Sequence, residues 1–256
     1  MPHTIPTVTL AWLLYTSTLW GQLAVFGDLY LNGNAQLHIA FDQTYFSGGK
    51  LRTDPTPSAD AVLSFGPQSK WEQLKGDSYV VGKVRIYHEG TFTFPIGSED
   101  RFSPITFEVF QNTSFIQTQY TETPPALLTQ FEVPFTPPLY HYWSWEITGE
   151  VIARLRAYWT EQHRLDRLSF DSIDPTELQF GLYVNSTWQS VLGHHSSNPF
   201  LPDLPLSIAN GSILLLEPIL LETAKGLSFT VPNTHTVLKK KLIIEGYQLR
   251  YPPLSS

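Results

Sequence analysis

Strict alternation of apolar and polar residues in short segments is the feature that most restricts how this chain can fold. In the longest such segment, Val151 to Trp159, every second residue is apolar, and Arg154 and Arg156 lie between them. A period of two places alternate side chains on opposite faces of a β-strand, one buried and one wet. A short helix is the alternative there, but the alternation is more regular than an i, i+4 pattern, and we predict a strand.

Turns separate the alternating segments along the chain. The 20 prolines and 16 glycines favour many turns and few long helices. Turns at intervals of about 8–12 residues between short strands are typical of antiparallel sandwiches. No internal repeat of about 20–50 residues is evident. We therefore expect an all-β fold, an antiparallel β-sandwich of the jelly-roll type.

The N-terminal part differs from this body in the shortness of its segments. Between Leu23 and Phe65, alternating runs of about five residues are separated by Gly and Asn turns. This predicts a short β-meander or a solenoid-like segment that packs on the body, because one or two turns of a solenoid cannot stand alone. The expected divisions are a signal peptide at 1–22, the N-terminal β segment at 23–69, the β-sandwich domain at 70–232, and a C-terminal strand and tail at 233–256.

The first 22 residues indicate export. Leu10 to Trp20 is apolar but shorter than the roughly 20 residues that span a bilayer, and it ends at Gly21-Gln22. This pattern predicts a signal peptide cleaved near Gln22; the alternative is a buried N-terminal helix or strand. No later segment reaches the length of a transmembrane helix. We expect a secreted protein at the cell surface or associated with the outer membrane.

Composition excludes several classes of function. The net charge is −7 and no basic stripe interleaved with aromatics is present, so nucleic acid is not an expected partner. The chain has no cysteine, which excludes disulfides, thiolate metal sites and a lipid anchor on cysteine. The short basic run Lys239 to Lys241 is interpreted as a solvated strand entrance or as protection of an edge strand.

The stretch from Tyr79 to Val109 predicts a hairpin, a tight corner and a further strand. The turn is expected at His88 to Gly90, with positive φ at the glycine, and a proline without an N–H should end a strand or lie at an edge. Two phenylalanines and an isoleucine should point inward. The structural motif consists of Gly90, Phe92, Phe94, Pro95, Ile96 and Gly97.

This block resembles the "FPIG" module of exported Bacteroidetes proteins. The resemblance is carried by Gly82-Lys83-Val84, by Gly90 to Gly97 and by Phe102 to Ile105, with weaker matches at Tyr140 to Trp143, Leu155 to Trp159, Leu182 to Gly193 and Ser228 to Thr230. It covers roughly Tyr79 to Val231. The resemblance implies a surface protein linked to type IX secretion or gliding motility. The family module brings no catalytic residues with it.

Motifs for chemistry are sparse. Glu146 and Glu150 are the best candidates for paired carboxylates, and their expected place is the wet face of a strand. His194-His195 with Asp203, or His141 with His163, lack the spacing of a metal site. No G-x-S-x-G elbow and no calcium loop is present. We therefore expect no catalytic, cofactor-binding or metal site.

Three functions remain open. The first is a non-enzymatic surface structural, adhesion or secretion-associated protein whose partners are other surface or secretion-system proteins, bound by strand addition at a C-terminal strand containing Tyr247, Leu249 and Tyr251. The second is a carbohydrate-binding module or weak glycoside hydrolase, with polysaccharide stacked on exposed rings of Trp143, Trp145, Trp159 and Trp188. The third is an outer-membrane β-barrel.

Overall fold

The fold consists almost entirely of β-strands. The computed structural model describes residues 22–40, 42–54, 59–73, 77–87, 89–112, 114–122, 142–160, 174–185, 187–200, 203, 205–207 and 210–230. Besides strands, these residues form one 3₁₀ turn at Pro175–Glu177. Within them, no helix has the length and apolar character needed to cross a membrane. The prediction of an all-β fold is confirmed.

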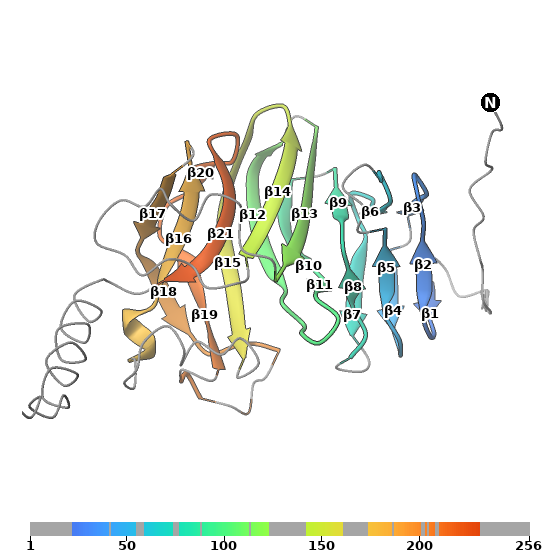
Figure 1. The fold of residues 1–256 in the computed structure, drawn as a ribbon, viewed down its shortest axis with the longest axis horizontal. Helices are drawn as coiled ribbons and strands as arrows, with labels where there is room; N and C mark the ends of the chain where they lie inside the picture. The colour runs from blue at the N-terminus through green and yellow to red at the C-terminus, as the bar shows by residue number, and fades with distance from the viewer. Residues whose placement is uncertain are drawn as a thin grey trace, which may run out of the picture.

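The N-terminal part is a three-sided stack of parallel strands (Figure 1). The first side holds β1 (Gln22–Val25), β4 (Gln43–Phe46) and β7 (Lys70–Gln73). The second holds β2 (Leu29–Leu31), β5 (Leu51–Thr53), β8 (Val80–Val81) and β11 (Ile96–Gly97), and the third holds β3 (Gln36–Ile39), β6 (Val62–Phe65) and β9 (Val84–Ile86). Parallel pairing throughout is the arrangement of a solenoid, not of a meander.

Stacking places equivalent side chains of successive turns above one another. In the third side, Ile39 pairs with Phe65 and Phe65 with Ile86, and all three are buried. Apolar columns of this kind line the interior, and each fully buried side chain contributes about 1.5–3 kcal/mol relative to an exposed one. The parallel stacking continues beyond Ser69, as far as Gly97.

The rest of the described chain forms two larger sheets. The eight-stranded sheet has the order β17-β16-β21-β14-β13-β9-β6-β3, so the third side of the solenoid continues into it. Its further strands are β13 (Phe115–Thr121), β14 (Tyr142–Thr148), β16 (Gln179–Val184), β17 (Thr187–Val191) and β21 (Ala224–Thr230). The six-stranded sheet has the order β10-β12-β15-β19-β18, with β20 also on β15. Its strands are β10 (Gly90–Phe94), β12 (Ile105–Asn112), β15 (Val151–Thr160), β18 (Gly193–Ser196), β19 (Asn210–Leu215) and β20 (Ile219–Leu220).

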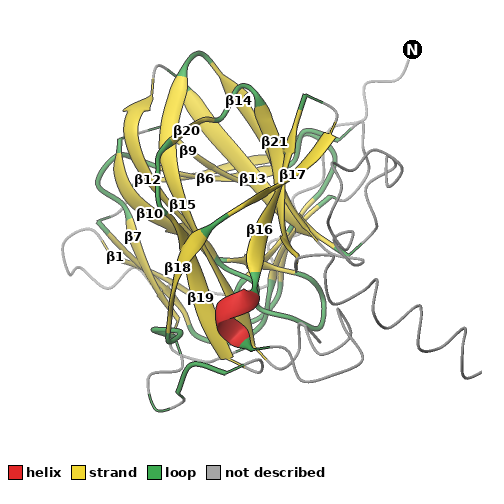
Figure 2. Ribbon diagram, turned by 90° about the vertical axis from the view of Figure 1, so that its left-hand side faces the viewer, coloured by secondary structure: helices red, strands yellow, loops and turns green. Residues whose placement is uncertain are grey.

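The two sheets form separate layers (Figure 2), and aromatic side chains pack between them. The ring of Phe107 on β12 meets that of Trp145 on β14 with centroids 5.8 Å apart, and Trp159 on β15 meets Phe229 on β21 at 5.5 Å. Phe65 of the solenoid contacts a ring of the six-stranded sheet at 5.2 Å. The interior of the solenoid and the space between the layers are therefore one core.

The predicted hairpin between Val84–Ile86 and Thr91–Phe94 is wrong. Strand β9 pairs with β6 and β13 in the eight-stranded sheet, whereas β10 pairs with β12 in the six-stranded sheet. The connection around Glu89 therefore crosses from one layer to the other. Alternation identified both strands and both inward faces correctly, but two strands that bury faces against a common core can do so from opposite layers. The expected positive φ at Gly90 is present, at 97°.

The FPIG motif forms the crossover from the six-stranded sheet to the second side of the solenoid. Phe94 and Ile96 are fully buried, and Pro95 lies in the break between β10 and β11 at the sheet edge, as predicted. The Val80 amide donates to the Pro95 carbonyl at 2.7 Å, which ties the corner to β8. A Cβ on Gly97 would lie 2.1 Å from the carbonyl oxygen of Arg101, so only glycine fits there.

Candidate functional site

The four tryptophans considered for sugar binding lie in the core. Trp143 and Trp159 are 0% exposed, Trp188 is 1% exposed and Trp145 is 5% exposed. Trp143 Nε1 donates to the Ser103 carbonyl at 2.8 Å, and Trp159 Nε1 donates to the Ser207 carbonyl at 3.0 Å. The rings pack between the two layers, because they fall on the inward positions of β14, β15 and β17. None of them offers a face to a polysaccharide, and this corrects the expectation of an aromatic groove.

The two candidate carboxylates lie apart from the core. Glu146 accepts a hydrogen bond from Gln117 Nε2 at 3.0 Å, and the same glutamine accepts from Arg85 at 2.7 Å. This row of polar side chains crosses three neighbouring strands on their outer face. Glu150 is exposed in the turn between β14 and β15. Their arrangement agrees with the expected wet-face position.

The histidines form no metal site among the described residues. His194 is exposed on β18, and the His195 ring makes a hydrogen bond of 2.7 Å with the Leu178 carbonyl. No group of three potential ligand side chains occurs within the part of the chain that the structure describes. His141 and His163 lie outside the described residues, as does the C-terminal segment with Tyr247, Leu249 and Tyr251.

A surface groove of about 780 Å³ lies beside the second side of the solenoid. It runs along the carboxyl ends of β2, β5, β8 and β11 and reaches the end of β13 and Glu146 on β14, so four parallel strands and two strands of the large sheet form its walls. Its lining includes Tyr30, Arg52, Lys83, Glu99, Glu122 and Glu146.

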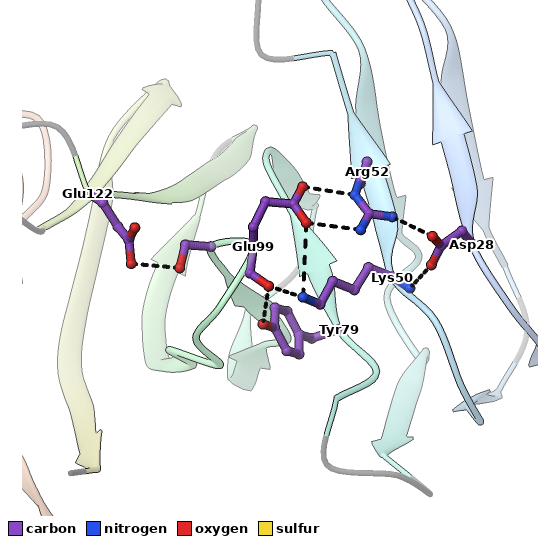
Figure 3. Close-up of polar contacts among 7 residues, drawn as sticks. Asp28, Lys50, Arg52, Tyr79, Glu99 and Glu122 are labelled. Atoms are coloured by element: carbon purple, nitrogen blue, oxygen red, sulfur yellow. Dashed lines mark hydrogen bonds and ion pairs between the residues drawn. The ribbon is translucent and has the colours of Figure 1, made fainter. Parts of the chain in front are cut away.

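Arg52 is the central cation of the groove wall (Figure 3). Its Nε and one terminal nitrogen donate to the two carboxylate oxygens of Glu99 at 2.8 and 2.9 Å. Its other terminal nitrogen lies 3.0 Å from Asp28, and its guanidinium lies 5.1 Å from the ring centroid of Tyr30. Such a bidentate pair fixes the orientation of the guanidinium plane and of the carboxylate plane. The arginine thus joins the first turn of the solenoid to the loop after β11.

These contacts shift the pKa values of the groups concerned. The hydrogen bond from Arg52 lowers the pKa of Glu99, and the backbone amide of Lys50, 2.7 Å from Asp28 Oδ1, lowers the pKa of that aspartate. Burial raises the pKa of Tyr79, whose hydroxyl points to the Glu99 carbonyl, to about 12. At neutral pH the carboxylates are charged and the phenol is neutral.

A second ion pair holds the opposite wall. Arg101 lies 3.0 Å from the Glu122 carboxylate, and Ser98 Oγ donates to the same oxygen at 2.7 Å. Lys83 donates to the Ala59 carbonyl at 2.9 Å. These charged side chains of the groove lining are therefore already engaged within the protein. A general acid needs a carboxyl with a raised pKa; the carboxyls in the described residues whose pKa values are shifted, Asp28, Glu99 and Asp174, are all shifted downward.

Sequence reasoning did not find this groove. Arg52 and Glu99 are 47 residues apart, and only the stacking of solenoid turns brings them together. The sequence signal for the groove is the recurrence of strand ends at Leu31, Thr53 and Val81. These ends can be aligned with one another only when the register of the solenoid turns is known.

Comparison with protein-family models, with curated proteins and with solved structures finds no match for this chain.

Proposed function

We propose that this protein is an exported, non-enzymatic component of the bacterial surface that acts through protein–protein interfaces. In this proposal its antiparallel part is a β-sandwich of the jelly-roll type, and the solenoid turns extend that sandwich into a longer platform. The resemblance of Tyr79 to Val231 to the Bacteroidetes FPIG module supports the assignment to surface or secretion-associated proteins. The apolar run Leu10 to Trp20 supports export.

The observation that supports a non-enzymatic role is that carboxylates of the groove are already bound by other side chains of the protein. Glu99 is held by Arg52 and Glu122 by Arg101 in structural ion pairs, and Glu146 accepts a hydrogen bond from Gln117. Fixed, charged carboxylates favour binding over proton transfer. The groove carries more acidic than basic side chains, which favours a partner segment that presents Lys or Arg.

Export is tested in a Bacteroidetes host that possesses type IX secretion and in an isogenic strain without it. We expect a polypeptide that begins near Gln22 and is degraded by protease added to intact cells. The double variant Leu13→Arg/Leu14→Arg, which interrupts the apolar run, should stay inside the cells at full length. Export is refuted if the wild-type chain, like the double variant, keeps its first residues and resists the protease. The type IX route is refuted if the amount of protein at the cell surface is equal in both strains.

Partner binding is tested by removing residues 239–256. If the C-terminal segment adds a strand to a partner, the truncated protein should be released from the surface into the medium while its melting temperature is unchanged. A large fall in the melting temperature would show instead that the segment belongs to the core.

A further inference from the structure

The N-terminal end of the solenoid presents three strand edges. In the described part of the chain, β1, β2 and β3 each pair on one side only, with β4, β5 and β6 (Figure 1). The three strands form the sides of one turn, so their free edges face in the same direction along the solenoid axis. Backbone N–H and C=O groups on such edges are templates for pairing with another chain.

Backbone hydrogen bonds to the second turn identify which backbone groups face this end. The Leu29 amide donates to the Lys50 carbonyl at 3.0 Å, and the Leu31 carbonyl accepts from Asp54 at 2.8 Å, so these residues pair with the second turn. Along a strand of a parallel sheet, the N–H and C=O groups of one residue point to the same neighbouring strand, and those of the next residue point to the opposite side. Tyr30 therefore points its N–H and C=O to the open end. The same reasoning from the Val25, Ala35 and Ile39 carbonyls assigns Ala24, Gln36 and His38 to it.

The interior is also less covered at this end. The inward side chains of Leu23, Val25, Leu29 and Leu37 are only partly buried. Their partners one turn further in, Thr44, Phe46, Leu51 and Leu63, are all buried. Leu31 and Ile39 of the first turn are already buried, so this end leaves part of its apolar interior uncovered, inside a rim of backbone donors and acceptors.

The usual protection of strand edges is missing from the first turn. Residues 22–40 contain no lysine, arginine or proline, the residues with which natural proteins block edge pairing. Their one carboxylate, Asp28, is paired with Arg52 of the second turn. In a chain with a net charge of −7, this end is close to neutral, so two copies of it can meet without opposing like charges.

We propose that two copies of this chain associate end to end through the first solenoid turn, around a two-fold axis that passes through β2. The axis reverses strand direction, so β2 pairs antiparallel with β2 of the second copy, and β1 pairs with β3. The lengths match, because β1 and β3 have four residues each. Tyr30 faces its own counterpart at the axis, and the half-buried leucines of both copies close over one continuous core. This proposal concerns the N-terminal end alone and stands independently of export and of the surface function.

Backbone blocking tests the pairing. Ala24→Pro and His38→Pro remove backbone N–H groups that make no bond to the second turn. His38→Pro also removes the 2.9 Å hydrogen bond between the His38 ring and Ser64 Oγ, so His38→Ala, which keeps the backbone N–H, is measured beside it as the side-chain control. Light scattering on the wild-type chain should give twice the monomer mass at high concentration, and the double variant should remain a monomer with an unchanged melting temperature. If Ala24→Pro/His38→Pro lowers the melting temperature by more than a few degrees, Gln36→Lys, which leaves the backbone intact, replaces it.

Cross-linking gives a second test, because the chain has no cysteine of its own. Antiparallel partners in a hydrogen-bonded pair have Cα atoms about 5.5 Å apart, within the range of a disulfide. Mild oxidation of Tyr30→Cys should yield a covalent dimer within minutes, whereas the control Leu192→Cys, 63% exposed and remote from this end, should not. A protein that is monomeric at all concentrations, or a Tyr30→Cys variant that cross-links no faster than the control, overturns the proposal.

Discussion

Replacing Phe94 with alanine tests whether the FPIG corner holds the layers and the solenoid together. Phe94 is fully buried at the end of β10, and its ring lies 5.1 Å from the rings of both Phe92 and Phe107. Removing a buried phenylalanine side chain costs about 3–5 kcal/mol, because the transfer energy is lost and a cavity remains. The whole free energy of unfolding of a domain is typically about 5–15 kcal/mol, so roughly a fifth or more of it is at stake.

Urea denaturation followed by tryptophan fluorescence measures this change directly. The matched control is Phe110→Ala on the neighbouring strand β12, where the ring is 49% exposed and the expected change is within about 0.5 kcal/mol. For a chain of this size, the loss at Phe94 corresponds to a fall in melting temperature of roughly 6–20 °C. If Phe94→Ala costs no more than Phe110→Ala, the corner does not carry the core and the reasoning fails.

Three further changes have defined outcomes. Gly97→Ala should destabilise by about 1–3 kcal/mol in urea, because its Cβ would overlap the Arg101 carbonyl, and wild-type stability would refute the close approach. The pKa of Glu99 is lowered in the folded state, so its pair with Arg52 stabilises the fold at pH values above the unfolded pKa of 4.5, and this stabilisation is lost as the pH falls through the folded pKa. The urea midpoint of Glu99→Gln should therefore fall less than that of the wild type between about pH 5 and 3. Identical pH profiles for the two proteins would contradict this. Trp188→Phe removes the indole N–H, which has no partner in the described part of the chain, and leaves a smaller ring; its cost in urea should be that of the vacated space alone, well below the roughly 3–5 kcal/mol of truncating a buried aromatic side chain to alanine, and a loss of that full size would contradict the reasoning.

Alternation in the sequence predicted strands and buried faces well because both are local properties. Val151 to Trp159 forms β15, with its odd-numbered residues inward, and the motif residues from Phe92 to Ile96 are buried as expected. The tryptophans could be assigned to strands but not to surfaces, since an inward and an outward aromatic face have the same period. Burial had to come from the opposite layer: Phe107 of the six-stranded sheet packs on Trp145, and Phe229 of the eight-stranded sheet packs on Trp159.

Pairing between distant strands was not predictable from the sequence. The turns of the solenoid have unequal lengths, with second-side strands starting at Leu29, Leu51, Val80 and Ile96, so no fixed repeat appears. The groove depends on that register, because Arg52 meets Glu99 only once the turns are stacked. A local pattern cannot distinguish a hairpin from a crossover between layers, and this is why the connection around Glu89 was predicted wrongly.

The eight-stranded sheet has a mechanical consequence. Its strands lie across the long axis of the molecule, so tension along that axis would pull neighbouring strands apart one hydrogen-bonded pair at a time instead of shearing a whole ladder (Figure 1). The seam between β14 and β21 has two residue pairs in register, Trp143 with Leu227 and Ser144 with Gly226. Trp145 bridges the same seam through its indole N–H, 3.3 Å from the Leu221 carbonyl. Under tension, the hydrogen bond of this tryptophan helps to hold the seam together. The molecule should resist pulling along its strands far better than pulling along its long axis.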